Sequence, residues 1–187
     1  KDPKPVIAVH KVGKASYCVE TGGENPETEI FDKIVFALPL PLLPDLIEDL
    51  PESLGCELKG LPYTRSMVVA MGLSRPFAGR SFINTFLRYQ VPTLATVVHD
   101  LGKGEGRIPK GTGLATAILT KEASTRLFDK PDGEVSEAVL REMDSVWPGF
   151  SASALFSRVY RWPFGAVQLP PGTLSRQPGI RDMLDSL

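Results

Sequence analysis

The chain has 187 residues and a nearly balanced charge, with 21 Lys and Arg against 22 Asp and Glu. This balance gives no electrostatic reason to expect nucleic acid or an anionic membrane surface as a partner, and no apolar run approaches the roughly 18 residues of a membrane-spanning helix. The 17 Gly and 17 Pro residues fall between apolar runs, which is typical of a loop-rich globular chain with one sizeable core.

The first elements are predicted to be a hairpin and a third strand. Residues 5–9 and 15–20 are rich in strand formers and are separated by a turn at Gly13. The apolar run at residues 30–36 lacks alternation, so we expect a strand that is buried on both faces. Pro39 ends this strand because proline cannot donate to a ladder, and the leucines of residues 43–50 have helical spacing.

The middle of the chain is predicted to consist mainly of strands. Residues 64–73 indicate a long strand, and shorter strand candidates follow at residues 82–89, 93–98 and 114–120. The glycine-rich residues 102–113 fit neither GxGxxG nor GxxxxGK, so a mobile hairpin loop is favoured over a phosphate-binding loop.

Two helices and a last strand complete the predicted elements. Thr120 is expected to cap a helix at residues 121–128, and Asp132 one at residues 134–147. A strand at residues 155–162 is followed by an irregular Pro- and Gly-rich arm at residues 163–172, and a final helix is expected to begin at Pro178.

These elements predict an α+β fold. Short turns between strands, with the helices grouped between them, favour a mixed, largely antiparallel sheet of about six to eight strands with helices packed on one face. The chain contains no internal repeat and no linker long enough to divide it.

Side-chain chemistry is sparse, and neither a catalytic residue nor a metal site is predicted. His10 and His99 are the two histidines, and GxSxG, HExxH and CxxC motifs are absent. The adjacent acids at 48–49 are explained by solvation. Cys18 and Cys56 have no metal-ligand spacing and are expected to be free core residues in a reducing compartment, which predicts a cytoplasmic protein.

Trp162 is the strongest candidate for ligand contact. It ends a strand and precedes the Pro- and Gly-rich arm, where Gly165 and Gly172 would let a ligand approach the backbone closely. An indole at a strand end can form one wall of a site for a planar conjugated ligand. The alternative is that Trp162 is a core aromatic residue and the arm a surface loop.

Three segments of the chain resemble the flavin-containing amine oxidase superfamily, which includes protoporphyrinogen oxidases, monoamine and polyamine oxidases and phytoene desaturase-like enzymes. Residues 5–19 are similar to its PV..I strand and the hairpin after it. Residues 31–39, FDKIVFALP, are similar to its aD.VV.A.P segment. Residues 161–172 are similar to its RW..A.P.y.pG segment, although Gln168 replaces the first family proline.

The resemblance implies a set of FAD-binding residues. By similarity, Val6 contacts the adenine end of FAD through its backbone, Ala37, Leu38 and Pro39 lie along the dinucleotide, and Trp162 approaches the isoalloxazine ring. On the substrate side the resemblance suggests the strand residues Met67, Val69 and Met71 together with Gln168. Core packing explains the three strand residues equally well.

The resemblance also implies a function. Residues 1–187 are expected to be the substrate-binding portion of an FAD-dependent oxidoreductase, with residues 1–39 and 160–187 edging an FAD-binding domain in another part of a longer chain. Such an enzyme oxidises an amine or conjugated substrate by hydride transfer to flavin, and this portion is expected to be inactive alone.

The expected partners are a small hydrophobic or amine-bearing substrate and the rest of the same chain, with no nucleic acid; membrane association is left open. The alternative function is a non-catalytic module for hydrophobic-ligand binding or oligomerisation. A flavin absorption spectrum of the full-length protein would discriminate between the two.

Overall fold

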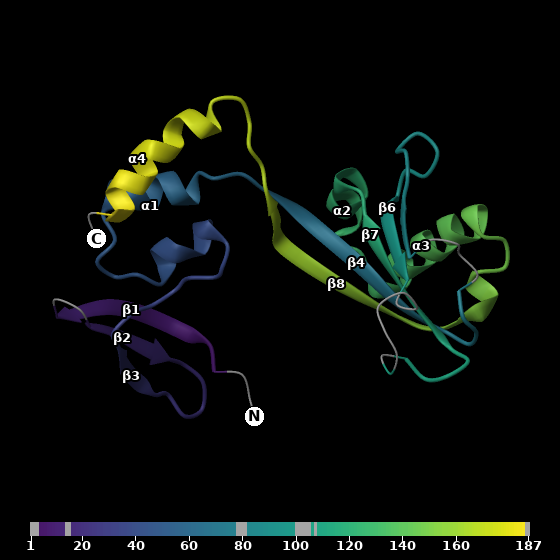
Figure 1. Ribbon diagram of the computed structural model, residues 1–187, viewed down its shortest axis with the longest axis horizontal. Helices are drawn as coiled ribbons and strands as arrows, with labels where there is room; N and C mark the ends of the chain where they lie inside the picture. Colours follow the sequence, from purple (N-terminus) through teal and green to yellow (C-terminus); the bar gives the residue numbers. More distant parts are fainter. Residues whose placement is uncertain (1–3, 14–15, 78–81, 100–105, 107, 186–187) are drawn as a thin grey trace. The chain divides into compact units, whose positions relative to one another are not determined.

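The computed structural model describes residues 4–13, 16–77, 82–99, 106 and 108–185. They form two compact units (Figure 1). Unit 1 comprises residues 1–62 and 167–187, and unit 2 comprises residues 63–166. The chain therefore passes from one unit to the other between residues 62 and 63 and returns between residues 166 and 167, without a linker segment at either crossing.

Unit 1 contains an antiparallel three-stranded sheet in the order β1-β2-β3, made of β1 (Val6–Gly13), β2 (Ser16–Thr21) and β3 (Thr28–Phe31). The predicted hairpin is confirmed, since β1 pairs with β2 in a register that sets His10 opposite Cys18. The outer edge of β1 is also paired, because Val9 N donates to Leu46 O at 2.7 Å and Glu48 N donates to Val9 O at 3.3 Å.

The expected buried strand at residues 30–36 is wrong in two respects. β3 ends at Phe31, and its four residues are all exposed. Residues 33–37 continue without secondary structure, and in the described part of the chain they make no backbone hydrogen bond; Val35 is 90% exposed. A strand is buried on both faces only when neighbours flank it, and here only β2 pairs with β3.

The helix expected within residues 43–50 is also wrong. Residues 40–45 form a 3-10 helix, η1 (Leu40–Asp45), because closely spaced prolines remove the N–H groups that an α-helix needs. The α-helix α1 (Glu52–Lys59) follows, and α4 (Thr173–Asp185) starts five residues before the expected Pro178. A small apolar cluster of Leu43, Leu54 and Leu58, with Ile180 from α4 against it, packs these helices together.

Unit 2 is built on a five-stranded sheet in the order β5-β6-β7-β4-β8. Its strands are β4 (Tyr63–Leu73), β5 (Ile83–Thr85), β6 (Leu94–His99), β7 (Gly113–Leu119) and β8 (Ala154–Val167). β4 pairs antiparallel with β7, β7 with β6, and β6 with β5. The predicted long strand at residues 64–73 is confirmed, whereas β8 extends through the first five residues of the expected irregular arm.

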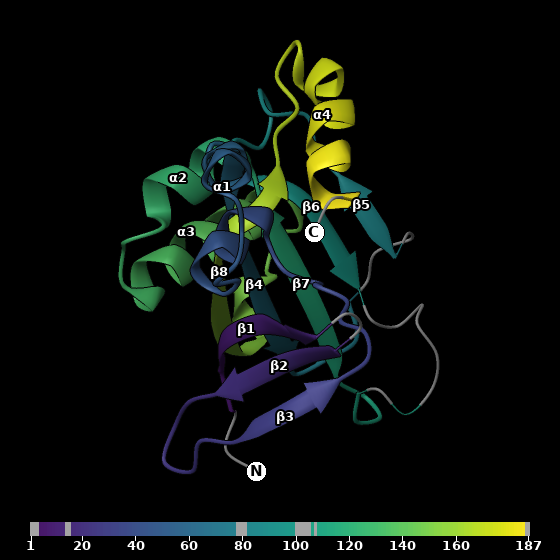
Figure 2. The same ribbon diagram turned by 90° about the vertical axis from the view of Figure 1, so that its left-hand side faces the viewer.

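The helices α2 (Lys121–Leu127) and α3 (Asp132–Val146) pack on one face of this sheet, with the 3-10 turn η3 (Ser151–Ser153) after α3 (Figure 2). Their buried residues join alternate residues of β4, β6 and β7 in the main hydrophobic core. The predicted α+β class with helices on one sheet face is therefore confirmed, and the described residues contain eight strands divided between two sheets. No described helix is long and apolar enough to cross a membrane.

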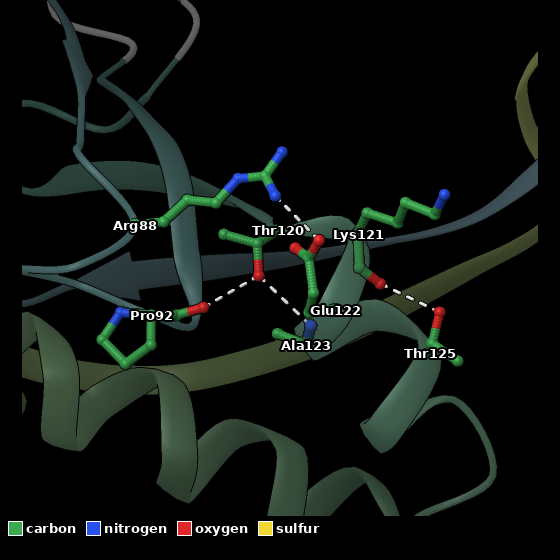
Figure 3. Close-up of polar contacts among 7 residues, drawn as sticks. All are labelled: Arg88, Pro92, Thr120, Lys121, Glu122, Ala123 and Thr125. Atoms are coloured by element: carbon green, nitrogen blue, oxygen red, sulfur yellow. Dashed lines mark hydrogen bonds and ion pairs between the residues drawn. The ribbon is translucent and has the colours of Figure 1, made fainter. Parts of the chain in front are cut away.

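One predicted helix cap is confirmed and the other is wrong. The Thr120 hydroxyl accepts a hydrogen bond from Ala123 N at 3.1 Å and donates one to Pro92 O at 2.8 Å, which fixes the start of α2 (Figure 3). Asp132 is the first residue of α3 rather than its cap. Its carboxylate instead accepts a hydrogen bond from Arg161 of β8 at 2.6 Å.

Candidate functional site

Trp162 lies in an exposed row of aromatic side chains on β8. Its ring stacks on Tyr160, with centroids 6.0 Å apart and an interplanar angle of 24°. Both side chains are more than two-fifths exposed, as is Phe156 on the same strand. Val159 and Arg161 alternate with these aromatic residues along β8. Val159 packs against the main core, and Arg161 bonds Phe128 O at the end of α2. The aromatic row therefore lies on the sheet face opposite the helices.

This face extends across the neighbouring strands. The residues that alternate with the core positions of β4, β6 and β7 are half-buried, and they are apolar or hydroxylated. We call this surface the open face, and its residues are Val68, Ala70, Thr96, Val98, Leu114, Thr116, Ile118, Phe156, Arg158, Tyr160 and Trp162. Its one charged residue is Arg158, and it includes no carboxylate and no imidazole, so it suits an apolar or aromatic ligand better than a cation.

The predicted substrate residues of β4 lie on the other side of the sheet. Met67, Val69 and Met71 are 0% exposed and belong to the main core beneath α2 and α3. Val68 and Ala70, which alternate with them, are on the open face. The burial of Met67, Val69 and Met71 fits the alternative that they are core residues. A contact between the substrate and these three side chains stays a prediction.

The remaining predicted residues belong to unit 1. Val6 is 42% exposed at the start of β1, Ala37 is exposed, and Leu38 and Pro39 are half-buried where η1 begins. Gln168 is half-buried, and its backbone N donates to Pro62 O at 2.7 Å. The predicted FAD residues are thus divided, four in unit 1 and Trp162 in unit 2.

A cavity of about 210 Å³ lies at the end of β4 that carries Leu73, and its lining includes Arg75, Phe77, Trp147 and Phe150. None of the predicted site residues lines it. Beside it, the His99 ring is 3.6 Å from the Phe77 ring, and its Nε2 is 2.9 Å from the Asn84 amide nitrogen. His99 is 3% exposed, which is the burial of a core histidine.

The structure also joins residues that sequence spacing did not connect. His10, Cys18 and Glu20 each offer a ligand atom within 4.8 Å of the other two. The predicted hairpin already contained a signal for this group. Residues paired across a hairpin share a sheet face, as do residues two apart on one strand, so His10, Cys18 and Glu20 lie on the same face. Both cysteines are free, but the expectation that both are core residues is wrong for Cys56, which is exposed.

The chain matches the family model of flavin-containing amine oxidoreductases over residues 4–186. A comparison with curated proteins gave no match. Among solved structures, it resembles a provisionally assigned protoporphyrinogen oxidase from Exiguobacterium sp. 255-15, with 16% identity, a TM-score of 0.68 and 98% of this chain covered. It also resembles cyclohexylamine oxidase from Brevibacterium oxydans IH-35A, with 16% identity, a TM-score of 0.66 and 94% covered.

A third similar structure is a reduced UDP-galactopyranose mutase, with 12% identity, a TM-score of 0.69 and 97% of this chain covered. The chain spans 39% of the length of each of these three proteins. At such identities the structural likeness shows the fold alone, whereas the family model covers nearly every residue. The chain therefore belongs to the family of flavin-containing amine oxidoreductases.

Proposed function

We propose that this chain provides the substrate-side wall and part of the FAD-binding surface of an FAD-dependent oxidoreductase. The open face is the observation that supports this best. It places a row of exposed aromatic rings beside half-buried apolar strands, while the helices pack on the opposite face. A surface of this kind orients a planar or apolar molecule and excludes water from it.

Unit 1 offers groups that fit a dinucleotide. Residues 33–37 have backbone N–H and C=O groups without hydrogen bonds in the part of the chain that the structure describes, and they lead directly to Leu38 and Pro39. Backbone groups that are unpaired on both sides of a segment can pair with strands from another part of the protein. Val6 and Ala37 are exposed, so both are accessible to FAD.

The bound FAD would supply the redox chemistry, accepting a hydride equivalent from a C–H bond next to nitrogen or within a conjugated system. The residues of this chain would orient the substrate and keep water away, roles that need few acid–base groups. In this proposal unit 2 is the substrate-binding domain and unit 1 edges the FAD-binding domain, which refines the division expected at residues 1–39 and 160–187.

The open face favours one kind of substrate. An ammonium group far from the flavin would need a carboxylate partner, and the residues of the open face include none. A monoamine with an apolar body, or a conjugated molecule without a cationic group, therefore fits better than a diamine.

The test uses the full-length protein. We expect flavin absorption after purification and oxidation of apolar monoamines or conjugated substrates. Replacing Trp162 with Ala should lower kcat/KM by about 10-fold or more, since misplacing a substrate is costly. Leu155→Ala is the matched control, because Leu155 is a 65% exposed apolar residue of the same strand; it should change kcat/KM little.

Two outcomes would contradict the proposal. A colourless full-length protein that co-purifies with a hydrophobic molecule would favour the non-catalytic binding module. Equal effects of Trp162→Ala and Leu155→Ala on kcat/KM would show that the open face does not contact the substrate. This result would not bear on the proposed binding of FAD.

A further inference from the structure

We propose that His10, Cys18, Glu20 and Glu48 bind a zinc ion in unit 1. Three of these residues come from the β1–β2 hairpin, whose strands lie side by side in both views (Figures 1 and 2). His10 is paired across the hairpin with Cys18, and Glu20 is two residues further along β2, so their side chains share one sheet face. Their ligand atoms all lie within 4.8 Å of one another.

Glu48 supplies the fourth ligand from outside the hairpin. Its backbone N donates to Val9 O, which holds the segment after η1 along the outer edge of β1. This contact brings the Glu48 Oε2 atom to 3.8 Å from His10 Nδ1. The Glu20 Oε1 atom is 3.9 Å from the same nitrogen.

These distances fit an ion better than hydrogen bonds. His10 Nδ1 is buried without a hydrogen-bond partner, and 3.8–3.9 Å is too long for one. In a tetrahedral zinc site, with ligands at about 2.0–2.3 Å, neighbouring ligand atoms are separated by about 3.3–3.8 Å. An ion between the imidazole nitrogen and the two carboxylates would therefore draw these atoms closer together and give the nitrogen a partner.

The ligand types indicate zinc. An imidazole, a thiolate and two carboxylates form a mixed N, S and O set, and a thiolate disfavours magnesium and calcium. Cys18 is 6% exposed, the Glu20 carboxylate lies within 4.8 Å of its sulfur, and the Glu48 carboxylate lies beside His10, so the group carries negative charge that a dication neutralises. Because four protein ligands leave no open position, the ion would be structural and would tie the segment after η1 to the hairpin.

The experiment uses the full-length protein, treated with a chelator and then titrated with Zn²⁺ by calorimetry. We expect one zinc ion at this site and a zinc-edge X-ray absorption spectrum with one sulfur and three N or O neighbours. Cys18→Ser should remove the sulfur signal and weaken binding at least about 100-fold, because even changes around the ligands cost about 10–100-fold.

Glu48→Gln provides a second variant that leaves the packing of unit 1 unchanged, since the Glu48 side chain is 64% exposed. It should weaken zinc binding by about 10-fold or more. The matched controls are Cys56→Ser and Glu29→Gln, which change the exposed cysteine of α1 and a glutamate on the other face of β3; both should bind zinc as the unmodified protein does.

The proposal is overturned if Cys18→Ser and Glu48→Gln bind zinc as the controls do, or if the absorption spectrum contains no sulfur neighbour. Flavin absorption, recorded on the same samples, reports separately on the proposed redox function.

Discussion

At the residue scale, Asp144 fixes the turn between α3 and η3. The Ser151 hydroxyl donates a short hydrogen bond to its carboxylate, and Ser151 N donates a second one at 2.9 Å. These bonds, with weaker help from the backbone of Phe150 and Gly149, hold the pKa of Asp144 below its ordinary value of 3.8. The charged carboxylate is therefore the form that the folded state prefers.

This shift predicts a pH-dependent contribution to stability. Because the native state binds the proton less readily than the unfolded chain, the contribution is fully present above about pH 4 and declines as the pH falls through the lowered native pKa. We expect Asp144→Asn to destabilise the protein at pH 7 and to cost progressively less below about pH 4. Urea unfolding followed by tryptophan fluorescence would measure this difference.

The exposed Asp49 provides the control for this prediction. Asp49→Asn should leave the stability unchanged at pH 7. A cost of Asp144→Asn that stays constant between pH 7 and pH 3 would show that the Asp144 charge has no role in the turn.

Arg161 connects β8 to the end of α2. Its Nε donates to Phe128 O at 2.7 Å, and its two terminal nitrogens donate to Asp132 and to Lys130 O at 2.6 and 2.7 Å. Three donors in one plane are available from a guanidinium and not from an ammonium. The Arg of the family's RW segment is thus a scaffold residue here, holding the strand that presents Trp162.

We therefore expect Arg161→Lys to lower the free energy of unfolding by about 1.5–3 kcal/mol, the usual range for lost hydrogen bonds to a charged group. Urea denaturation would measure it. Arg158→Lys, at an exposed position of the same strand, is the control and should cost under about 0.5 kcal/mol. Equal costs for the two variants would contradict the scaffold role.

At the element scale, Gly165 determines how closely β8 approaches β4. A Cβ at this position would lie 2.2 Å from Ser66 Cβ and 3.0 Å from Ser66 N. From the sequence alone, Gly165 and Gly172 are expected to let a ligand approach the backbone closely. For Gly165 the space is taken by β4, and Gly172, with φ of +88°, forms the turn before α4.

Gly165→Ala should destabilise unit 2 by about 1–3 kcal/mol, because the added methyl group is forced against the neighbouring strand. The double variant Gly165→Ala, Ser66→Gly should recover part of this loss by removing the clashing Cβ. Thermal unfolding of both variants tests the prediction. Gly133→Ala is the control, because a Cβ at Gly133 meets nothing within 4 Å. If Gly165→Ala lowers the stability no more than Gly133→Ala does, the close approach of β8 to β4 at Gly165 is contradicted.

At the scale of the whole molecule, the two units differ in how the chain builds them. Unit 2 is one continuous segment, residues 63–166, with a core of its own. Unit 1 is assembled from two segments, and β3 and most of residues 33–37 are exposed there. A continuous segment with its own core can fold alone, whereas exposed apolar strand residues call for neighbours.

We expect a fragment of residues 63–167 to fold cooperatively without the rest of the protein. Its urea transition should be single and should coincide by circular dichroism and fluorescence. The complementary segments 1–62 and 168–187, joined by a short linker, should show less protection from hydrogen exchange. A fragment 63–167 without a cooperative transition would show that its sheet depends on unit 1.

The sequence by itself determined the local elements that carry their own signals. Alternation in residues 64–73 and the turn at Gly13 predicted β4 and the hairpin, and Thr120 predicted a helix start, because each depends on neighbouring residues in the chain. The three family segments likewise indicate a flavin-containing oxidoreductase, and the family model matches residues 4–186.

Only the tertiary structure decided the rest, because burial and pairing depend on residues far apart in sequence. It showed that Met67 belongs to the core, that residues 33–37 lack partners in the described chain, and that Asp132 bonds Arg161 instead of capping α3. It also brought Glu48 beside His10, since the hydrogen bonds between the segment after η1 and β1 have no counterpart in any local pattern.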